Sequence, residues 1–99
     1  MGWSCTAKAM RTLDHIEDEL CGDTEHGSNA WAERKHVYFF EIGDEQRDGA
    51  ITGSIWRFTS DGQHATRSQS FRIEPDGRLA RGPASWRRVV EQRSESTWR

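Results

Sequence analysis

The chain has 99 residues, of which 33% are hydrophobic and 30% charged, and its formal net charge is −2 at neutral pH. This length fits one domain, residues 1–99, and excludes a second hydrophobic core of ordinary size. No apolar run approaches the roughly 20 residues of a membrane-spanning helix, so no membrane contact is expected. No basic stretch followed by an apolar one opens the chain, as a secretory signal would, which favours a cytoplasmic location.

An amphipathic helix is predicted over residues 5–21, because apolar side chains recur there at helical spacing. Ser4 is expected to cap its start and Gly22 to end it. Sixteen residues of helix span about 24 Å, whereas a disulfide needs Cα atoms within about 7 Å. Cys5 and Cys21 are therefore predicted to be free thiols, in keeping with a cytoplasmic protein.

Three Asp-Gly pairs, at residues 48–49, 61–62 and 76–77, separate β-prone stretches. Asp-Gly supplies the positive φ that tight hairpin turns need. These turns predict antiparallel strands over about 35–42, 50–59, 64–74 and 78–81, with a further strand starting near Trp31. The predicted fold class is α+β: an N-terminal helix packed on an antiparallel meander of four to five strands.

The C-terminal segment has two interpretations. Residues 84–92 are predicted as a short helix capped by Ser85, with Trp86, Val89 and Val90 on one face. A strand is the alternative, because Val89 and Val90 are adjacent β-branched residues. Residues 1–4 and 93–99 are expected to be frayed.

Both central strands carry large apolar side chains on both faces, because successive strand residues point to opposite sides. One amphipathic helix covers only one face of a sheet. Either the C-terminal segment covers the other face, or a second chain does, whether a copy of this one in a homodimer or a target protein. The side chains predicted to contact such a partner are Tyr38, Phe40, Trp56 and Phe58.

The charge is unevenly distributed. Residues 1–50 contain 5 basic and 11 acidic side chains, and residues 51–99 contain 9 basic and 5 acidic ones. Glu17, Asp18 and Glu19 end the predicted helix, where the helix dipole disfavours negative charge. Either arginines of the C-terminal half compensate them, or they form an acidic patch that captures a basic surface on a partner, such as a host protein that handles nucleic acid.

Single-stranded nucleic-acid binding is the alternative hypothesis. Trp56 and Phe58 would stack on bases while arginines contact phosphates. The acidic net charge and the scatter of the arginines over both sheet faces make nucleic acid the less favoured partner. The arginines concerned are Arg57, Arg67, Arg72, Arg78, Arg87 and Arg88.

Neither an enzyme, a metal site nor a cofactor site is predicted. Cys21, Asp23, Glu25, His26 and His36 lack the paired short spacing of zinc ligands. No cysteine is placed beside a histidine as a nucleophile would be. The segment 49–53 lacks the spacing and lysine of a phosphate-binding loop, so its second glycine is better explained by close packing within a strand.

The segments Met1-Gly-Trp-Ser-Cys5, Tyr38-Phe-Phe-Glu-Ile-Gly43 and Asp48-Gly-Ala-Ile-Thr-Gly53 resemble small uncharacterised proteins of bacteriophages and their high-GC hosts. The resemblance covers about two thirds of the chain and carries no catalytic residues. It implies a phage accessory protein in the host cytoplasm that binds and redirects a host protein. The leading hypothesis is therefore a small, non-enzymatic protein-binding module, either a phage accessory protein or an inhibitor of a host factor.

Overall fold

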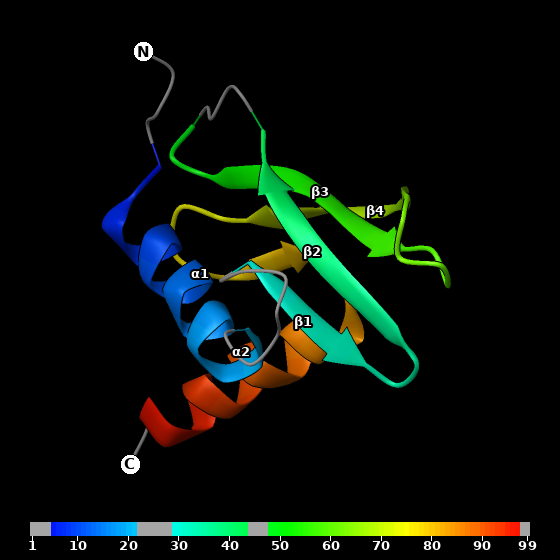
Figure 1. Cartoon of the computed structure of the whole chain (residues 1–99). Helices are drawn as coiled ribbons and strands as arrows, with labels where there is room; N and C mark the ends of the chain where they lie inside the picture. Colours follow the sequence, from blue (N-terminus) through cyan, green and yellow to red (C-terminus); the bar gives the residue numbers. More distant parts are fainter. Residues whose placement is uncertain (1–4, 22–28, 44–47, 98–99) are drawn as a thin grey trace.

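The computed structural model describes residues 5–21, 29–43 and 48–97, the last five as backbone only. Five strands form one antiparallel sheet in chain order, and a helix stands at each end of the sequence (Figure 1). This confirms the α+β class, the N-terminal helix and the five-stranded meander. In chain order the elements are α1 (Ala7–Leu20), β1 (Ala30–Glu33), β2 (His36–Ile42), β3 (Ile51–Phe58), β4 (Ala65–Ile73), β5 (Leu79–Arg81) and α2 (Ala84–Thr97).

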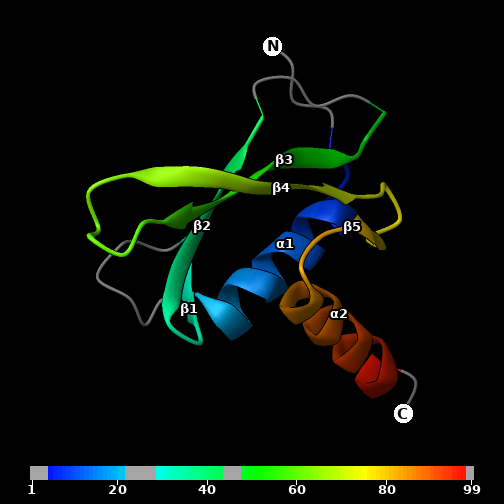
Figure 2. The same cartoon turned by 90° about the vertical axis from the view of Figure 1, so that its right-hand side faces the viewer.

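Both helices lie on the same side of the sheet, which gives the molecule two layers (Figure 2). The core lies between these layers. It is rich in aromatic rings, because Trp86 of α2 packs against Trp31, Phe40 and Phe71, with ring centroids 4.9–5.6 Å away. The other fully buried large side chains are Leu13, Ile16, Ile51, Ile55 and Ile73.

The C-terminal segment is helical, as predicted, but it does not cover the second face of the sheet. Trp86 and Val89 join the same buried cluster as Leu13 of α1, so α2 extends the helical layer instead. The helix also continues to Thr97, past residue 92 where its end was expected. Of the two alternatives for the second face of the sheet, the one in which this segment covers it is therefore wrong.

Helix α1 begins later than predicted, because Thr6 caps it. The Thr6 side chain accepts a hydrogen bond from the Ala9 backbone N–H, whereas Ser4 and Gly22 lie outside the described residues. The Thr6 hydroxyl also donates to the Pro75 carbonyl oxygen. The backbone N–H of Thr6 donates to the carbonyl oxygen of Gly49 at 2.9 Å. The cap thus ties the start of α1 to two hairpin turns.

The Asp-Gly pairs lie in turns, as predicted. Gly49, Gly62 and Gly77 all have a positive φ, and Asp48 also has a positive φ, of +61°. At the third pair, the backbone N–H of Glu74 donates to the Arg78 carbonyl oxygen, and the backbone N–H of Gly77 donates to the Glu74 carbonyl oxygen. These two hydrogen bonds close a tight hairpin. The turn between β1 and β2 contains no glycine and places Arg34 at a φ of +57°.

A β-bulge interrupts the pairing of β3 with β4. Ile55 is opposite Gln69 and Trp56 is opposite Arg67, so Ser68 is the extra residue. A bulge reverses the alternation of side chains along its strand. Arg67 therefore shares the face of Trp56, while Gln69 shares the face of Ile55.

No helix within the described residues is both long and apolar enough to cross a membrane. Cys5 and Cys21 are free thiols near the two ends of α1.

Candidate functional site

A cluster of large apolar side chains lies on the sheet face opposite the helices. Phe39 and Trp56 stack across β2 and β3, with ring centroids 6.3 Å apart and planes 10° from parallel. Phe39 also packs against Phe58 at 5.1 Å. All members of the cluster are half-buried, and both helices lie on the other side of the sheet. This cluster, called the aromatic face below, consists of Val37, Phe39, Trp56 and Phe58.

Of the four aromatic residues predicted to contact a partner, Trp56 and Phe58 lie on the aromatic face and the other two do not. Phe40 is 4% exposed and packs edge-on against Phe71 and Trp86 in the core. Tyr38 also faces the helical layer, where its ring stacks on Trp31. The proposed grouping is corrected because the register pairs Phe40 with Ile55 and Phe39 with Trp56.

Phe39 and Val37 are therefore the residues that the sequence hypothesis missed. The alternation within β2 already separates them from Phe40. What was lacking was the register between β2 and β3, which decides whether Phe39 or Phe40 stands beside Trp56. The loop between these strands is too long for its Asp-Gly pair alone to fix that register.

The acidic end of α1 belongs to the helical layer, on the opposite side of the molecule from the aromatic face (Figure 2). Burial raises the pKa of Glu17, and the carboxylates of Asp14 and Asp18 raise it further. In the described chain, ion pairs join Arg72 and Arg78 to Glu74, and none reaches these acids. The arginines whose side chains the structure describes thus leave the negative charge of α1 uncompensated, and one flat partner surface could not contact both regions.

The six candidate arginines do not form one patch. Arg67 stands opposite Trp56 on the aromatic face and is exposed. Arg72, opposite Thr52 on the same face, donates to the Glu74 carboxylate. The others lie elsewhere: Arg57 opposite Tyr38 on the helical side, Arg78 in the last hairpin turn, and Arg87 and Arg88 exposed on α2.

The described residues offer no arrangement for metal or cysteine chemistry. Among them, no group of three His, Cys, Asp or Glu side chains could hold a metal ion, and Asp23, Glu25 and His26 lie outside them. Burial raises the pKa of the Cys21 thiol to about 11, and the Glu17 carboxylate adds to this rise. A thiol with so high a pKa is scarcely ionised at neutral pH and is a poor nucleophile.

The fold and its surfaces define a two-layer α+β domain with both helices on one face of a five-stranded antiparallel sheet and an aromatic cluster on the other. Comparison of the chain with models of protein families, with curated proteins and with solved structures finds no match to any of them.

Proposed function

We propose that this chain is a small protein-binding module whose partner docks on the aromatic face. The observation that carries the proposal is the position of α1 and α2 on the same side of the sheet, which leaves four large apolar side chains half-buried on the other. Aromatic residues are enriched at the centres of protein interfaces, where burying them against a partner contributes most of the affinity.

The partner that fits this surface has an apolar centre flanked by a carboxylate. Arg67 is exposed beside Trp56, and the bulge at Ser68 turns it onto this face. In the described chain no ion pair engages it, so its guanidinium is available to a carboxylate of the partner. The resemblance to phage accessory proteins supports the same class of function, namely binding and redirecting a host protein in the cytoplasm.

The alternative, single-stranded nucleic-acid binding, has weaker support. Of the six candidate arginines only Arg67 is both exposed and on the aromatic face. Neutralising several phosphates needs several cations along one track. The stacked pair Phe39–Trp56 also occupies part of the ring surface that bases would use.

Site-specific photo-crosslinking tests the proposal. A benzophenone amino acid replaces Arg67 on the aromatic face or, as the matched control, Arg88 on the helical layer; both positions are exposed arginines. Irradiation in host lysate should join a protein of one discrete mass to the Arg67 variant and not to the Arg88 variant. The adduct should weaken when Phe39→Ser is added to the Arg67 variant.

The other outcomes are also decisive. An adduct with twice the mass of the chain would mean that the face binds a second copy. An adduct removed by nuclease would favour the nucleic-acid hypothesis. Equal labelling from the two positions would overturn the proposal.

A further inference from the structure

The outer edge of β4 is without a partner strand over most of its length. β3 pairs with β4 from Ala65 to Ile73, whereas β5 pairs only with the last two residues, Arg72 and Ile73. Figure 2 shows β5 beside one end of β4 only. Within the described residues, no backbone hydrogen bond from outside the sheet reaches residues 65–71. This segment is called the open edge below.

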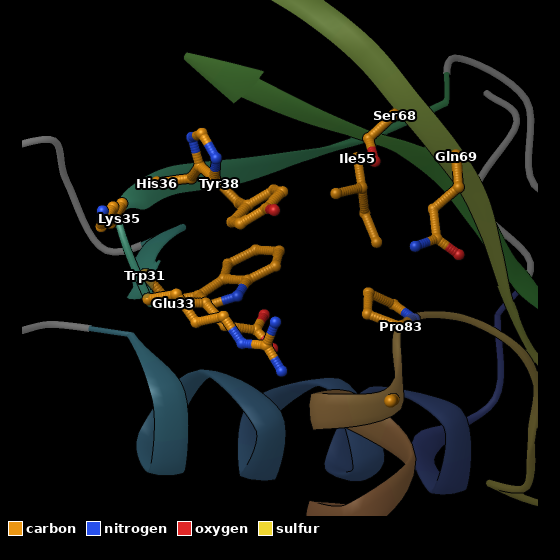
Figure 3. A pocket seen from close by; sticks show the side chains of 11 residues that line it. Trp31, Glu33, Lys35, His36, Tyr38, Ile55, Ser68, Gln69 and Pro83 are labelled. Atoms are coloured by element: carbon orange, nitrogen blue, oxygen red, sulfur yellow. The ribbon is translucent and has the colours of Figure 1, made fainter. Parts of the chain in front are cut away.

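β5 stops early because Gly82 and Pro83 follow Arg81. Proline has no N–H and a fixed φ, so it does not continue a strand ladder. The chain turns here toward the start of α2. A cavity of about 490 Å³ lies between Pro83 and the bulged part of β4, and Figure 3 shows Gln69 and Pro83 on opposite sides of this space. The segment that follows β5 is thus separated from the open edge.

The side chains of the open edge confirm that it is accessible. Arg67 points to the aromatic face and Gln69 to the helical side, and both are exposed. Thr66 and Ser68, which lie between and beside them in the chain, are exposed as well. Exposure on both faces of one strand is typical of the rim of a sheet, where another strand can approach in the plane.

The backbone groups that face this edge can be identified from both ends of β4, because alternate residues bond to the same neighbour. The Glu74 N–H donates to the Arg78 carbonyl oxygen at 2.7 Å, toward β5. At the other end, the Thr59 N–H donates to the His64 carbonyl oxygen at 2.8 Å, so His64 faces β3. Alternation from these two points directs the following backbone groups to the open edge: those of Ala65, Arg67 and Ser70.

The charge beside the open edge is positive. Arg67, Arg72 and Arg81 share the aromatic side of β4 and β5, and Arg72 stands directly opposite Arg81. Like charges directly opposite each other destabilise a strand pair. The Glu74 carboxylate pairs with Arg72, but no ion pair among the described residues engages Arg67 or Arg81. A carboxylate on an added strand would therefore be stabilised here.

The same features disfavour a second copy of this chain as the added strand. Two open edges brought together would oppose arginine to arginine, which is a common protection of sheet edges. The bulge at Ser68 also interrupts the flat run of hydrogen bonds that two identical edges need. An acidic segment meets the charge, and a segment without a fixed fold can follow the bulge.

We infer that the open edge of β4 binds an extended acidic segment of a protein partner as an additional strand. Its backbone pairs with that of Ala65, Arg67 and Ser70, as in other cases of strand addition. Its carboxylates lie beside Arg67 and, at the end of the strand, Arg81. The side chains between them point to the cavity beside Gln69 and Pro83. These hydrogen bonds lie in the plane of the sheet, so this contact and the proposed contact on the aromatic face can each fail without the other.

The test titrates the full chain with a short peptide of alternating glutamate and valine and follows amide hydrogen exchange by NMR. Binding should saturate with a dissociation constant of about 1 mM or below. Exchange at Ala65, Arg67 and Ser70 should slow by about tenfold when the peptide is about tenfold above that constant. The fully N-methylated peptide, which keeps the charges but cannot donate from its backbone, should give no protection.

Charge is tested with matched variants. Arg67→Ala combined with Arg81→Ala should weaken binding of the glutamate peptide by about fivefold, as the loss of two exposed charge pairs would. Arg87→Ala combined with Arg88→Ala on α2 should leave the binding unchanged. The same peptide with lysine in place of glutamate should bind about tenfold more weakly.

Each other outcome overturns the inference. The absence of saturable protection, or equal protection by the N-methylated or the lysine peptide, would do so directly. Protection that appears without peptide and grows with protein concentration would mean that a second copy pairs with the edge. Shifts of the Trp56 and Phe58 rings without protection of Ala65, Arg67 and Ser70 would place the peptide on the aromatic face, which would leave the proposed function standing and refute strand addition.

Discussion

Phe39 and Trp56 stack across adjacent strands, 6.3 Å apart and nearly parallel, on the face of the sheet that neither helix covers. Aromatic pairs in this geometry contribute about 0.5–1.5 kcal/mol beyond the area that they bury. The pair therefore stabilises the sheet, and it also presents a rigid apolar surface. A partner bound there would gain the burial of side chains that are already held in place, at little cost in side-chain entropy.

Gly53 of β3 lies where the sheet leaves no room for a side chain. A Cβ at this position would lie 2.1 Å from the Glu41 carbonyl oxygen and 2.7 Å from the Phe71 ring. Gly53→Ala is expected to destabilise the protein by more than about 3 kcal/mol, because backbone and core would both have to move. Urea unfolding measures the effect.

The matched control is Gly62→Ala, where an added Cβ meets nothing within 4 Å but φ is +71°. It should cost only the left-handed strain, about 1–2 kcal/mol. If the two variants lost equal stability, the close approach at Gly53 would be refuted.

Trp86 is the anchor of α2. Its side chain is 0% exposed and contacts rings from three strands. Trp86→Ala should cost about 3–5 kcal/mol, a large fraction of the stability of a small domain. Thermal unfolding and the loss of helical circular dichroism would report it. Trp56→Ala, which removes a half-buried ring, should cost distinctly less, and an equal loss would contradict the assignment of Trp86 to the core.

Thr12 joins α1 to the last hairpin. Its hydroxyl donates to the Gly77 carbonyl oxygen at 2.7 Å, and the residue is 3% exposed. Thr12→Val keeps the shape but leaves the carbonyl without this donor, so stability should fall by about 1 kcal/mol. Thr66→Val at an exposed site on β4 is the control, and its unfolding midpoint should stay close to that of the parent.

Glu17 is expected to destabilise the folded state when it is charged. Its pKa is raised by burial and by Asp14 and Asp18, so the unfolded chain releases this proton at a lower pH than the folded one. Stability contributed by protonated Glu17 is therefore present at low pH. It is lost as the pH rises through the pKa of Glu17 in the unfolded chain and then through its raised pKa in the folded protein. Glu17→Gln should stabilise the protein at neutral pH by roughly 0.2–0.5 kcal/mol, the size of one like-charge helix contact.

The gain from Glu17→Gln should vanish as the pH falls below about 4.5, the ordinary pKa of this side chain. Urea midpoints measured across this range provide the comparison. Glu41→Gln on the exposed side of β2 controls for the loss of one surface carboxylate. A gain that persists in acid would show that the effect does not arise from charge.

The elements that could be predicted from the sequence are those specified locally. The Asp-Gly turns required positive φ, and the alternation along β2 and β3 showed apolar side chains on both faces. Gly53 was expected where something packs closely, and the Cβ contacts confirm this. Local patterns of this kind depend on backbone geometry within a few residues, which the sequence states directly.

The features that could not be predicted depend on long-range pairing. The register Phe39–Trp56 is set by two strands joined by a long loop, and one residue of slip exchanges the faces. Counting back from the buried Phe71 assigns Arg67 to the helical side, but the bulge at Ser68 moves it beside Trp56. The position of α2 depends on where Trp86 finds partners, which no periodicity within residues 84–92 reveals.

The accessibility of the aromatic face is the claim on which the proposed function depends. It can be measured by the relaxation that a soluble gadolinium complex induces in aromatic ring protons. Phe39, Trp56 and Phe58 should relax strongly, while Phe40, Phe71 and Trp86 should be protected by the helices. Protection of Phe39 and Trp56 equal to that of Phe71 would contradict the account.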